Sequence, residues 1–122
     1  MSKIARKANA ALKKHALSYP EAWEDHPWGG TVAKVRKKIF CSLGHSPDSD
    51  EFICLSAKLP ESEAQALDLE GTEPTHYGLG KHGWVTFRLL PEDMPDIEVL
   101  KGYIDESYRT IAPKTLVKQL DA

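Results

Sequence analysis

The residues most capable of chemistry in this sequence are cations grouped around one predicted turn. No acidic residue occurs between His26 and Pro47, a stretch that contains four bases: Lys34, Arg36, Lys37 and Lys38. Lys34 and Arg36 are two residues apart on a predicted strand, so their side chains should share one face of it. Clustered cations without intervening acids are typical of a surface that binds phosphate groups.

A second group of residues lies on the last predicted strand, 84–89. Trp84 and Arg88 should share one face of this strand, because alternate residues point the same way. If this face coincides with that of the first group, cations lie beside an aromatic ring, which suits phosphate contacts and stacking on bases. The competing interpretation, which we favour, packs Trp84 in the core against Trp28 or Tyr77, because tryptophan is usually buried.

Other chemistries have little support in the sequence. The stretch 78–81 is similar to part of a P-loop, but Thr75 and His82 replace the glycine and the hydroxyl residue that the motif requires. The histidines lack the spacing of zinc or calcium ligands. Cys41 and Cys54 fall within apolar strands, where a thiolate is disfavoured. We therefore expect no metal, no cofactor and no catalytic activity.

Charge is distributed unevenly along the chain, although the net charge is only −2. Residues 1–47 hold nine bases and three acids, a net +6, whereas the remainder carries −8. This asymmetry indicates an acidic partner for the basic segment, unless the two segments interleave in space and cancel.

Length and composition indicate the class of protein. The chain has 122 residues, 41% hydrophobic and 28% charged, as expected for a single globular domain over residues 1–122. No stretch approaches the ~20 apolar residues of a membrane-spanning helix. The N-terminal residues do not resemble a secretory signal and there are only two cysteines, so we expect a cytoplasmic monomer without a membrane partner.

The elements that must position these residues are helices and strands in mixed order. Apolar periodicity and proline boundaries predict helices at 3–18, 60–69, from Pro95 to near Pro113, and at 114–120. Alternation predicts strands at 31–36, 38–43, 51–57 and 84–89. Residues 21–30 and 71–83 are expected to be irregular. Adjacent strands with short connections cannot be parallel, so we predict an α+β fold, a mainly antiparallel sheet with helices packed on it.

One detail of strand pairing also follows from this scheme. A hairpin between the strands 38–43 and 51–57 would place Cys41 opposite Cys54 and Leu43 opposite Phe52. In a reducing compartment the two thiols would then behave as small buried hydrophobes rather than as a disulfide.

Several short motifs, taken in order, resemble the MmcQ/YjbR family. They are Glu24-Asp25-His26-Pro27-Trp28-Gly29, Val32-Ala33-Lys34-Val35, Lys38-Ile39-Phe40, Ser56-Ala57-Lys58, Lys81-His82-Gly83-Trp84-Val85-Thr86 and Ile104-Asp105-Glu106-Ser107-Tyr108. The resemblance extends from about Leu12 to Leu120 and depends on the order and spacing of these motifs.

The resemblance implies a bacterial, cytoplasmic α+β domain with a fold similar to CyaY and frataxin. The family is commonly described as DNA-binding through a double-wing arrangement of strands and loops. That description would place contacts on the hairpin at Arg36–Lys38 and on the loop Lys81–Trp84. Iron binding does not follow from the frataxin likeness, because it would need an acidic first helix and this one is basic.

The leading hypothesis is therefore a small, non-catalytic DNA-binding protein. Its candidate contact residues are Lys34, Arg36, Lys37, Lys38, Lys58, Lys81, His82, Trp84 and Arg88. Four or five phosphate contacts predict a slope of log K against log salt of about −4. A second hypothesis is a module that binds a protein or a small acidic ligand through the loop Thr75–Trp84, beside Lys58 and Trp28. A third is an enzyme that uses His76 or His82.

Overall fold

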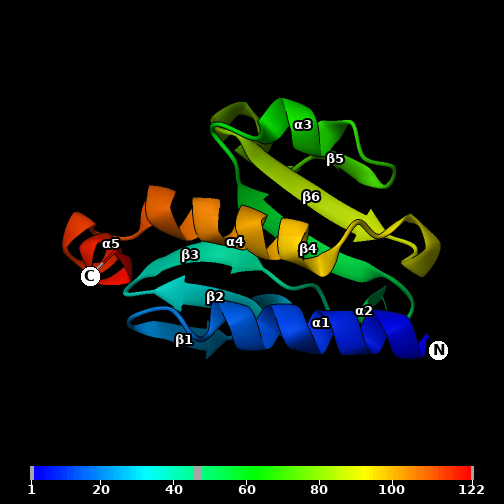
Figure 1. Ribbon diagram of the computed structural model, residues 1–122, viewed down its shortest axis with the longest axis horizontal. Helices are drawn as coiled ribbons and strands as arrows, with labels where there is room; N and C mark the ends of the chain where they lie inside the picture. Colours follow the sequence, from blue (N-terminus) through cyan, green and yellow to red (C-terminus); the bar gives the residue numbers. More distant parts are fainter. Residues whose placement is uncertain (1, 46–47, 122) are drawn as a thin grey trace.

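Figure 1 shows the computed structural model, which describes residues 2–45 and 48–121. The helices are α1 (Lys3–Ala16), α2 (Asp48–Glu51), α3 (Glu63–Leu67), α4 (Ile97–Ile111) and α5 (Lys114–Leu120), with 3₁₀ turns η1 (Pro27–Gly29), η2 (Leu79–His82) and η3 (Pro91–Asp93). The strands are β1 (Ala22–Asp25), β2 (Val32–Val35), β3 (Lys38–Ser42), β4 (Ile53–Lys58), β5 (Thr72–Pro74) and β6 (Trp84–Leu89). They form one antiparallel sheet of order β1-β2-β3-β4-β6-β5. The predicted α+β class with a mainly antiparallel sheet is confirmed.

The two long helices, α1 and α4, pack side by side on one face of the sheet (Figure 1). In α4 the predicted apolar stripe faces the core, and Leu100, Ile104 and Tyr108 are fully buried. In α1 the predicted stripe is wrong at its first position: Ile4 is 58% exposed and Ala5 is buried in its place. The reason is the 3.6-residue period of the helix, which rotates a strict four-residue repeat away from the core.

Two short strands and one short helix lie where the sequence predicted irregular chain. β1 and β5 are the two edge strands, and α2 lies between the predicted strands 38–43 and 51–57, with its last residue at the first position of the second one. Strands of three or four mostly polar residues carry no alternation signal. They form because a neighbouring strand is already in place to pair with them. The sheet therefore has six strands instead of the predicted four.

The predicted pairing of β3 with β4 is wrong by three residues. Cys41 lies opposite Ala57, and Ser42 lies opposite Ser56. The physical reason is that α2 and its flanking chain connect the two strands, so no tight turn fixes the register of the hairpin. Both thiols are free and buried, and burial raises the pKa of Cys41 to about 12 and that of Cys54 to about 11.

Candidate nucleic-acid interface

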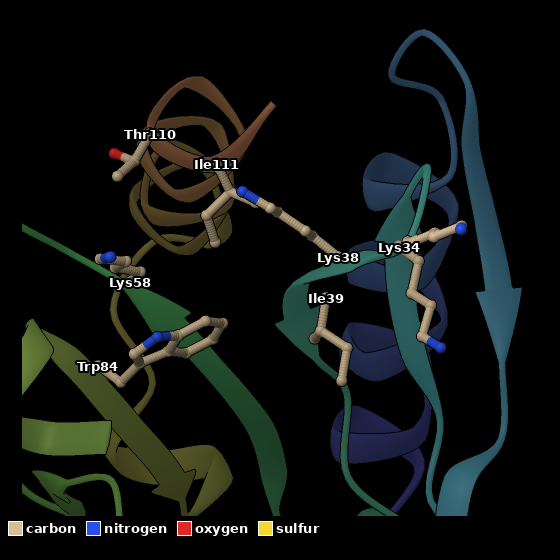
Figure 2. Close-up of a pocket in the computed structure, with 8 residues that line it drawn as sticks. Lys34, Lys38, Ile39, Lys58, Trp84, Thr110 and Ile111 are labelled. Atoms are coloured by element: carbon tan, nitrogen blue, oxygen red, sulfur yellow. The ribbon is translucent and has the colours of Figure 1, made fainter. Parts of the chain in front are cut away.

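A groove of about 440 Å³ opens between β3 and β4, beneath the C-terminal end of α4. Figure 2 shows its two walls, with Trp84 and Lys58 on one side and Ile39, Lys38 and Lys34 on the other. Eight residues line it: Lys34, Lys37, Lys38, Ile39, Lys58, Trp84, Thr110 and Ile111. Four of the eight are lysines and none is acidic, so the groove is strongly positive.

The groove starts next to a β-bulge in β3. β2 pairs with β3 at Ala33 opposite Cys41 and at Lys34 opposite Ile39, so Phe40 has no partner across the ladder. An extra residue of this kind bends a strand and increases its twist. β3 then pairs with β4 at only two positions before the strands part.

A side chain from α4 holds the strands apart at this point. If the ladder continued, Lys58 would lie opposite Phe40. Instead, the Lys58 N–H donates to Ser107 Oγ at 2.9 Å, and the Ser107 hydroxyl donates to the Phe40 carbonyl at 2.5 Å. Ser107 is completely buried. One hydroxyl therefore replaces a direct bond between two strands, and the groove lies beyond it.

On the Lys58 side of the groove, a cation and an aromatic ring lie together. Lys58 and Trp84 are direct partners in the β4–β6 ladder, so their side chains emerge on the same face. Gly83, at φ +86°, ends η2 and turns the chain into β6, a left-handed conformation that favours glycine. Trp84 is partly exposed within the groove. The interpretation that packs it against Tyr77 is wrong, because Tyr77 is fully exposed at 101%; the side chain of Trp28 lies outside the described residues.

The hairpin side of the groove has one paired and two unpaired lysines. Lys34 Nζ lies 2.7 Å from Asp25 Oδ2 and 5.1 Å from the centre of the Trp23 ring. The hydrogen bond from Lys34 lowers the pKa of Asp25, so this carboxylate stays ionised and offsets the Lys34 charge. Lys37 and Lys38 form no ion pair with any carboxylate of residues 2–45 or 48–121, and Figure 2 shows Lys38 reaching toward Ile111.

Four of the predicted contact residues do not line the groove: Arg36, Lys81, His82 and Arg88. The prediction that Arg36 belongs to the strand is wrong: β2 ends at Val35, and Arg36 lies in the following turn at φ +56°. Its Nε lies 3.3 Å from Glu21 Oε1. It therefore does not share a strand face with Lys34. Lys81 and His82 are exposed in η2.

Arg88 lies on the same face of β6 as Trp84 but four residues further along. Its guanidinium is held by Asp48 at 3.2 and 3.3 Å and lies 3.7 Å from the centre of the Phe52 ring. The same hydrogen bonds lower the pKa of Asp48. Arg88 thus connects β6 to α2 and is already satisfied by neighbours of its own chain.

The two histidines proposed for a possible enzyme, His76 and His82, both lie outside the groove. His76 Nε2 lies 2.7 Å from Glu73 Oε1, but both side chains are exposed and neither lines the groove. His82 is exposed as well. No group of three or more potential metal ligands occurs in these parts of the chain.

The ion pairs of the described residues stay within each of the two differently charged segments of the chain. Each acid of residues 1–47 pairs with a base of the same segment: Glu21 with Arg36, Glu24 with Lys13 and Asp25 with Lys34. In the described part of this segment, six bases have no ion pair: Lys3, Arg6, Lys7, Lys14, Lys37 and Lys38. No ion pair joins residues 2–45 to residues 48–121. Direct pairing between the described residues therefore does not neutralise one segment with the other.

A second cavity, of about 460 Å³, borders the groove at Thr110 and has the opposite character. It contains Asp105 and Glu106, and both carboxylates are already hydrogen-bonded. Asp105 accepts from Tyr19 and Arg109, and Glu106 accepts from the backbone and side chain at the start of α3. These acids stabilise the fold. Arg109, which also lines this cavity, pairs with Asp105 at 2.7 Å, so the unpaired acids at the α4 end of the groove are Glu61 and Glu106, among the described residues.

Sequence reasoning missed the residues of α4 that complete the site. Thr110 and Ile111 line the groove, and Ser107 opens it. A signal was present for Ser107, since it lies between Ile104 and Tyr108 on the core-facing side of the predicted helix. A hydroxyl at such a position needs a buried hydrogen-bond partner.

Comparisons with known proteins agree with this fold. No helix among the described residues is long and apolar enough to cross a bilayer, and no curated protein matches the chain. The chain is similar to the crystal structure of Deinococcus radiodurans protein DR2400, which contains a DUF419 domain. The TM-score is 0.67 at 24% identity, over 92% of this chain and 86% of that one. The family model YjbR matches residues 17–110, and with this match over most of its length the chain belongs to the YjbR family.

Proposed function

We propose that this protein binds DNA without catalysing a reaction, and that phosphate groups lie in the groove between β3 and β4. The observation that supports the proposal is the convergence of Lys37, Lys38 and Lys58 on one groove without a carboxylate. None of the three forms an ion pair with a described residue. Cations of this kind bind phosphates favourably because the nucleic acid releases its condensed counterions.

The two borders of the groove also suit a double-wing contact. The β2–β3 turn borders it through Lys37, and the segment before β6 borders it through Trp84. Lys34 contributes less than its neighbours because Asp25 offsets its charge. Arg36 and Arg88 are secondary contacts, since a phosphate would have to displace Glu21 or Asp48 from them. Lys81 and His82 contribute from the exposed turn η2.

A salt titration tests the proposal directly. Fluorescence anisotropy with a labelled duplex of about 20 base pairs should give a dissociation constant of roughly 10⁻⁴–10⁻⁶ M. Between about 50 and 200 mM KCl, the three unpaired groove lysines predict a slope of log K against log salt of about −3. A flat response to salt would contradict phosphate binding.

A matched pair of variants locates the contact. Lys37→Glu with Lys38→Glu should abolish measurable binding, because it reverses two unpaired charges of the groove. Lys3→Glu with Lys7→Glu makes the same change in net charge on α1, whose first residues lie at the other end of the molecule from the β2–β3 turn (Figure 1). This control should bind nearly as well as the wild type. Equal losses in both variants would show that only the overall charge matters.

A second candidate function uses the same groove for a small acidic ligand. The concave shape and the pairing of Lys58 with Trp84 favour it. Such a ligand would contact Trp84 and one or two lysines, so its affinity would depend weakly on salt and strongly on Trp84. Isothermal titration with a dicarboxylate, at two salt concentrations, separates this function from phosphate-backbone binding.

A further inference from the structure

We infer that the preferred ligand of the groove is a single strand of nucleic acid, one unpaired base of which stacks on Trp84. This inference rests on the proposed function and names the class of ligand. It depends on where Trp84 lies. The indole extends from the start of β6 into the groove, opposite Ile39 and next to Lys58 (Figure 2).

A stacked and paired base cannot reach this ring. In a duplex, the faces of the bases are covered by their neighbours and only their edges are accessible in the grooves. Trp84 forms part of one wall of a groove of the protein, with Ile39 and Lys38 on the facing wall (Figure 2). A phosphate of a duplex can touch the lysines at the rim, whereas contact with the indole face requires a base that has left the stack. Positive grooves that also hold aromatic side chains are typical of proteins that bind single strands.

The indole also has an unused hydrogen-bond donor. Trp84 Nε1 donates to no group of residues 2–45 or 48–121. Every buried side-chain nitrogen of these residues has a hydrogen-bond partner, so this unpartnered nitrogen is open to solvent. Figure 2 shows this nitrogen on the Lys58 side of the groove. It can donate to a base carbonyl or a phosphate oxygen while the ring carries the base. By contrast, the exposed indole of Trp23 already donates to the Arg36 carbonyl at 2.8 Å.

The surrounding charges define the path of the strand. Lys58 lies beside Trp84, and Lys37 and Lys38 lie on the facing wall, so phosphates on both sides of the stacked base meet unpaired cations. Beyond Thr110 the surface carries Glu61 and Glu106, which form no ion pair with a described residue and repel a polyanion, whereas Asp105 is paired with Arg109. The strand should therefore cross from Trp84 toward the β2–β3 turn and avoid the outer side of α4.

The test compares three labelled probes of equal length, about 12 nucleotides: oligothymidine, the same strand without bases, and a duplex. We expect the wild type to bind oligothymidine about tenfold more tightly than the abasic strand, the effect of one stacked base. Trp84→Leu should remove this difference, so that oligothymidine and the abasic strand bind with equal affinity. Tyr77→Leu, which removes a fully exposed aromatic ring outside the groove, should change neither affinity.

A more conservative variant keeps the test decisive if Trp84→Leu does not fold. Trp84→Phe retains a ring and should keep most of the preference for oligothymidine. The fluorescence of the wild type should be quenched by oligothymidine and that of Trp84→Phe much less, because the stacked indole is absent. Equal quenching in the two proteins would overturn the inference.

The outcomes distinguish this inference from the proposed function. Equal, salt-dependent affinities for all three probes would overturn base stacking and leave phosphate binding intact. Binding of none of them at low salt would overturn both. Thymidine monophosphate should displace the strand only at much higher concentration, because it supplies one phosphate; displacement at equal concentration would show that the ligand is a free nucleotide.

Discussion

The hydroxyl of Ser107 on α4 accepts a hydrogen bond from the backbone N–H of Lys58 on β4, at 2.9 Å. It donates its own proton to the Phe40 carbonyl on β3. The same serine thereby satisfies two strands and prevents them from pairing directly. The positive groove exists because these strands diverge, so a buried residue of the fold determines the shape of the proposed binding surface.

Replacement of this serine should cost stability. Ser107→Ala leaves the Lys58 N–H and the Phe40 carbonyl without their partner, and an unsatisfied buried group costs about 1–3 kcal/mol. Thr110→Ala removes an exposed hydroxyl one turn further on, which donates to the Glu106 carbonyl, and should change stability by about 0.5 kcal/mol or less. Urea unfolding of both variants measures the two values. Similar small changes in both would mean that the Ser107 bridge contributes little.

Removal of the carboxylate that pairs with Lys34 should strengthen binding of nucleic acid. Asp25→Asn frees the Lys34 ammonium within the groove, and one additional phosphate contact makes the salt slope steeper by about 0.9 on duplex DNA. The matched control is Glu98→Gln, which frees Lys101 on α4, a lysine outside the groove and not a proposed contact, and should leave the slope unchanged. Anisotropy titrations at several salt concentrations compare them. An unchanged slope for Asp25→Asn would argue against Lys34 as a contact.

The turn between β2 and β3 contains a strained residue that glycine should relieve. Arg36 has φ +56°, a left-handed conformation that costs a residue with a side chain about 1–2 kcal/mol. Arg36→Gly removes this cost. Glycine also gives the unfolded chain more conformational entropy, which lowers the free energy of unfolding by about 0.4–1 kcal/mol. The exposed ion pair with Glu21 contributes little. The expected net change is a stabilisation of up to about 1 kcal/mol, measured by chemical denaturation.

The neighbouring lysine provides the control for this prediction. Lys37 is not among the residues with positive φ, so Lys37→Gly brings only the entropic cost and should destabilise the protein by about 0.4–1 kcal/mol. Opposite signs for the two glycine variants are the expected result. Destabilisation of similar size in both would show that the turn is not strained at Arg36.

Stability should fall when the pH is lowered through the range in which histidine titrates. Burial, and then the charge of Lys101, lowers the pKa of His15 below 6.5, and its Nε2 lies 3.0 Å from the Tyr19 hydroxyl. The unfolded chain then binds more protons than the folded one. Stability is therefore complete above about pH 6.5 and is lost progressively as the pH falls toward the lowered pKa.

His15→Gln isolates this contribution, because glutamine retains an N–H donor and does not titrate. Thermal unfolding between about pH 7.5 and 5.5 should show a decrease in the melting temperature of the wild type and a much smaller decrease in that of the variant. The carboxylates with a lowered pKa, Glu24, Asp25 and Asp48, act at lower pH, below about 4.5. Parallel curves for the two proteins would exclude His15 as the titrating group.

Local pattern in the sequence was sufficient to predict much of the fold. β6 and α5 lie at the predicted residues, 84–89 and 114–120, because strict alternation defines the strand and a proline marks the start of the helix. The stripe of α4 was also predictable, since its apolar residues follow the helical period. These features depend on neighbours within a few residues, which the sequence displays directly.

The register of β3 against β4 and the edge strands required the tertiary structure. Cys41 and Ala57 are brought together across a connection that contains α2, and β1 and β5 form only against strands that are already in place. No local pattern encodes such pairings, because a short strand can pair with its neighbour in more than one register.

The same division holds for the candidate site. The sequence by itself nominated the cations and Trp84 by residue type and showed that the first 47 residues carry an excess of positive charge. Only the tertiary structure decided that Lys34, Lys37, Lys38 and Lys58 meet Trp84 in one groove, while Arg36 and Arg88 are held by carboxylates elsewhere. Charge is a property of each residue, whereas pairing and the shape of a groove depend on distances between segments that are far apart in the chain.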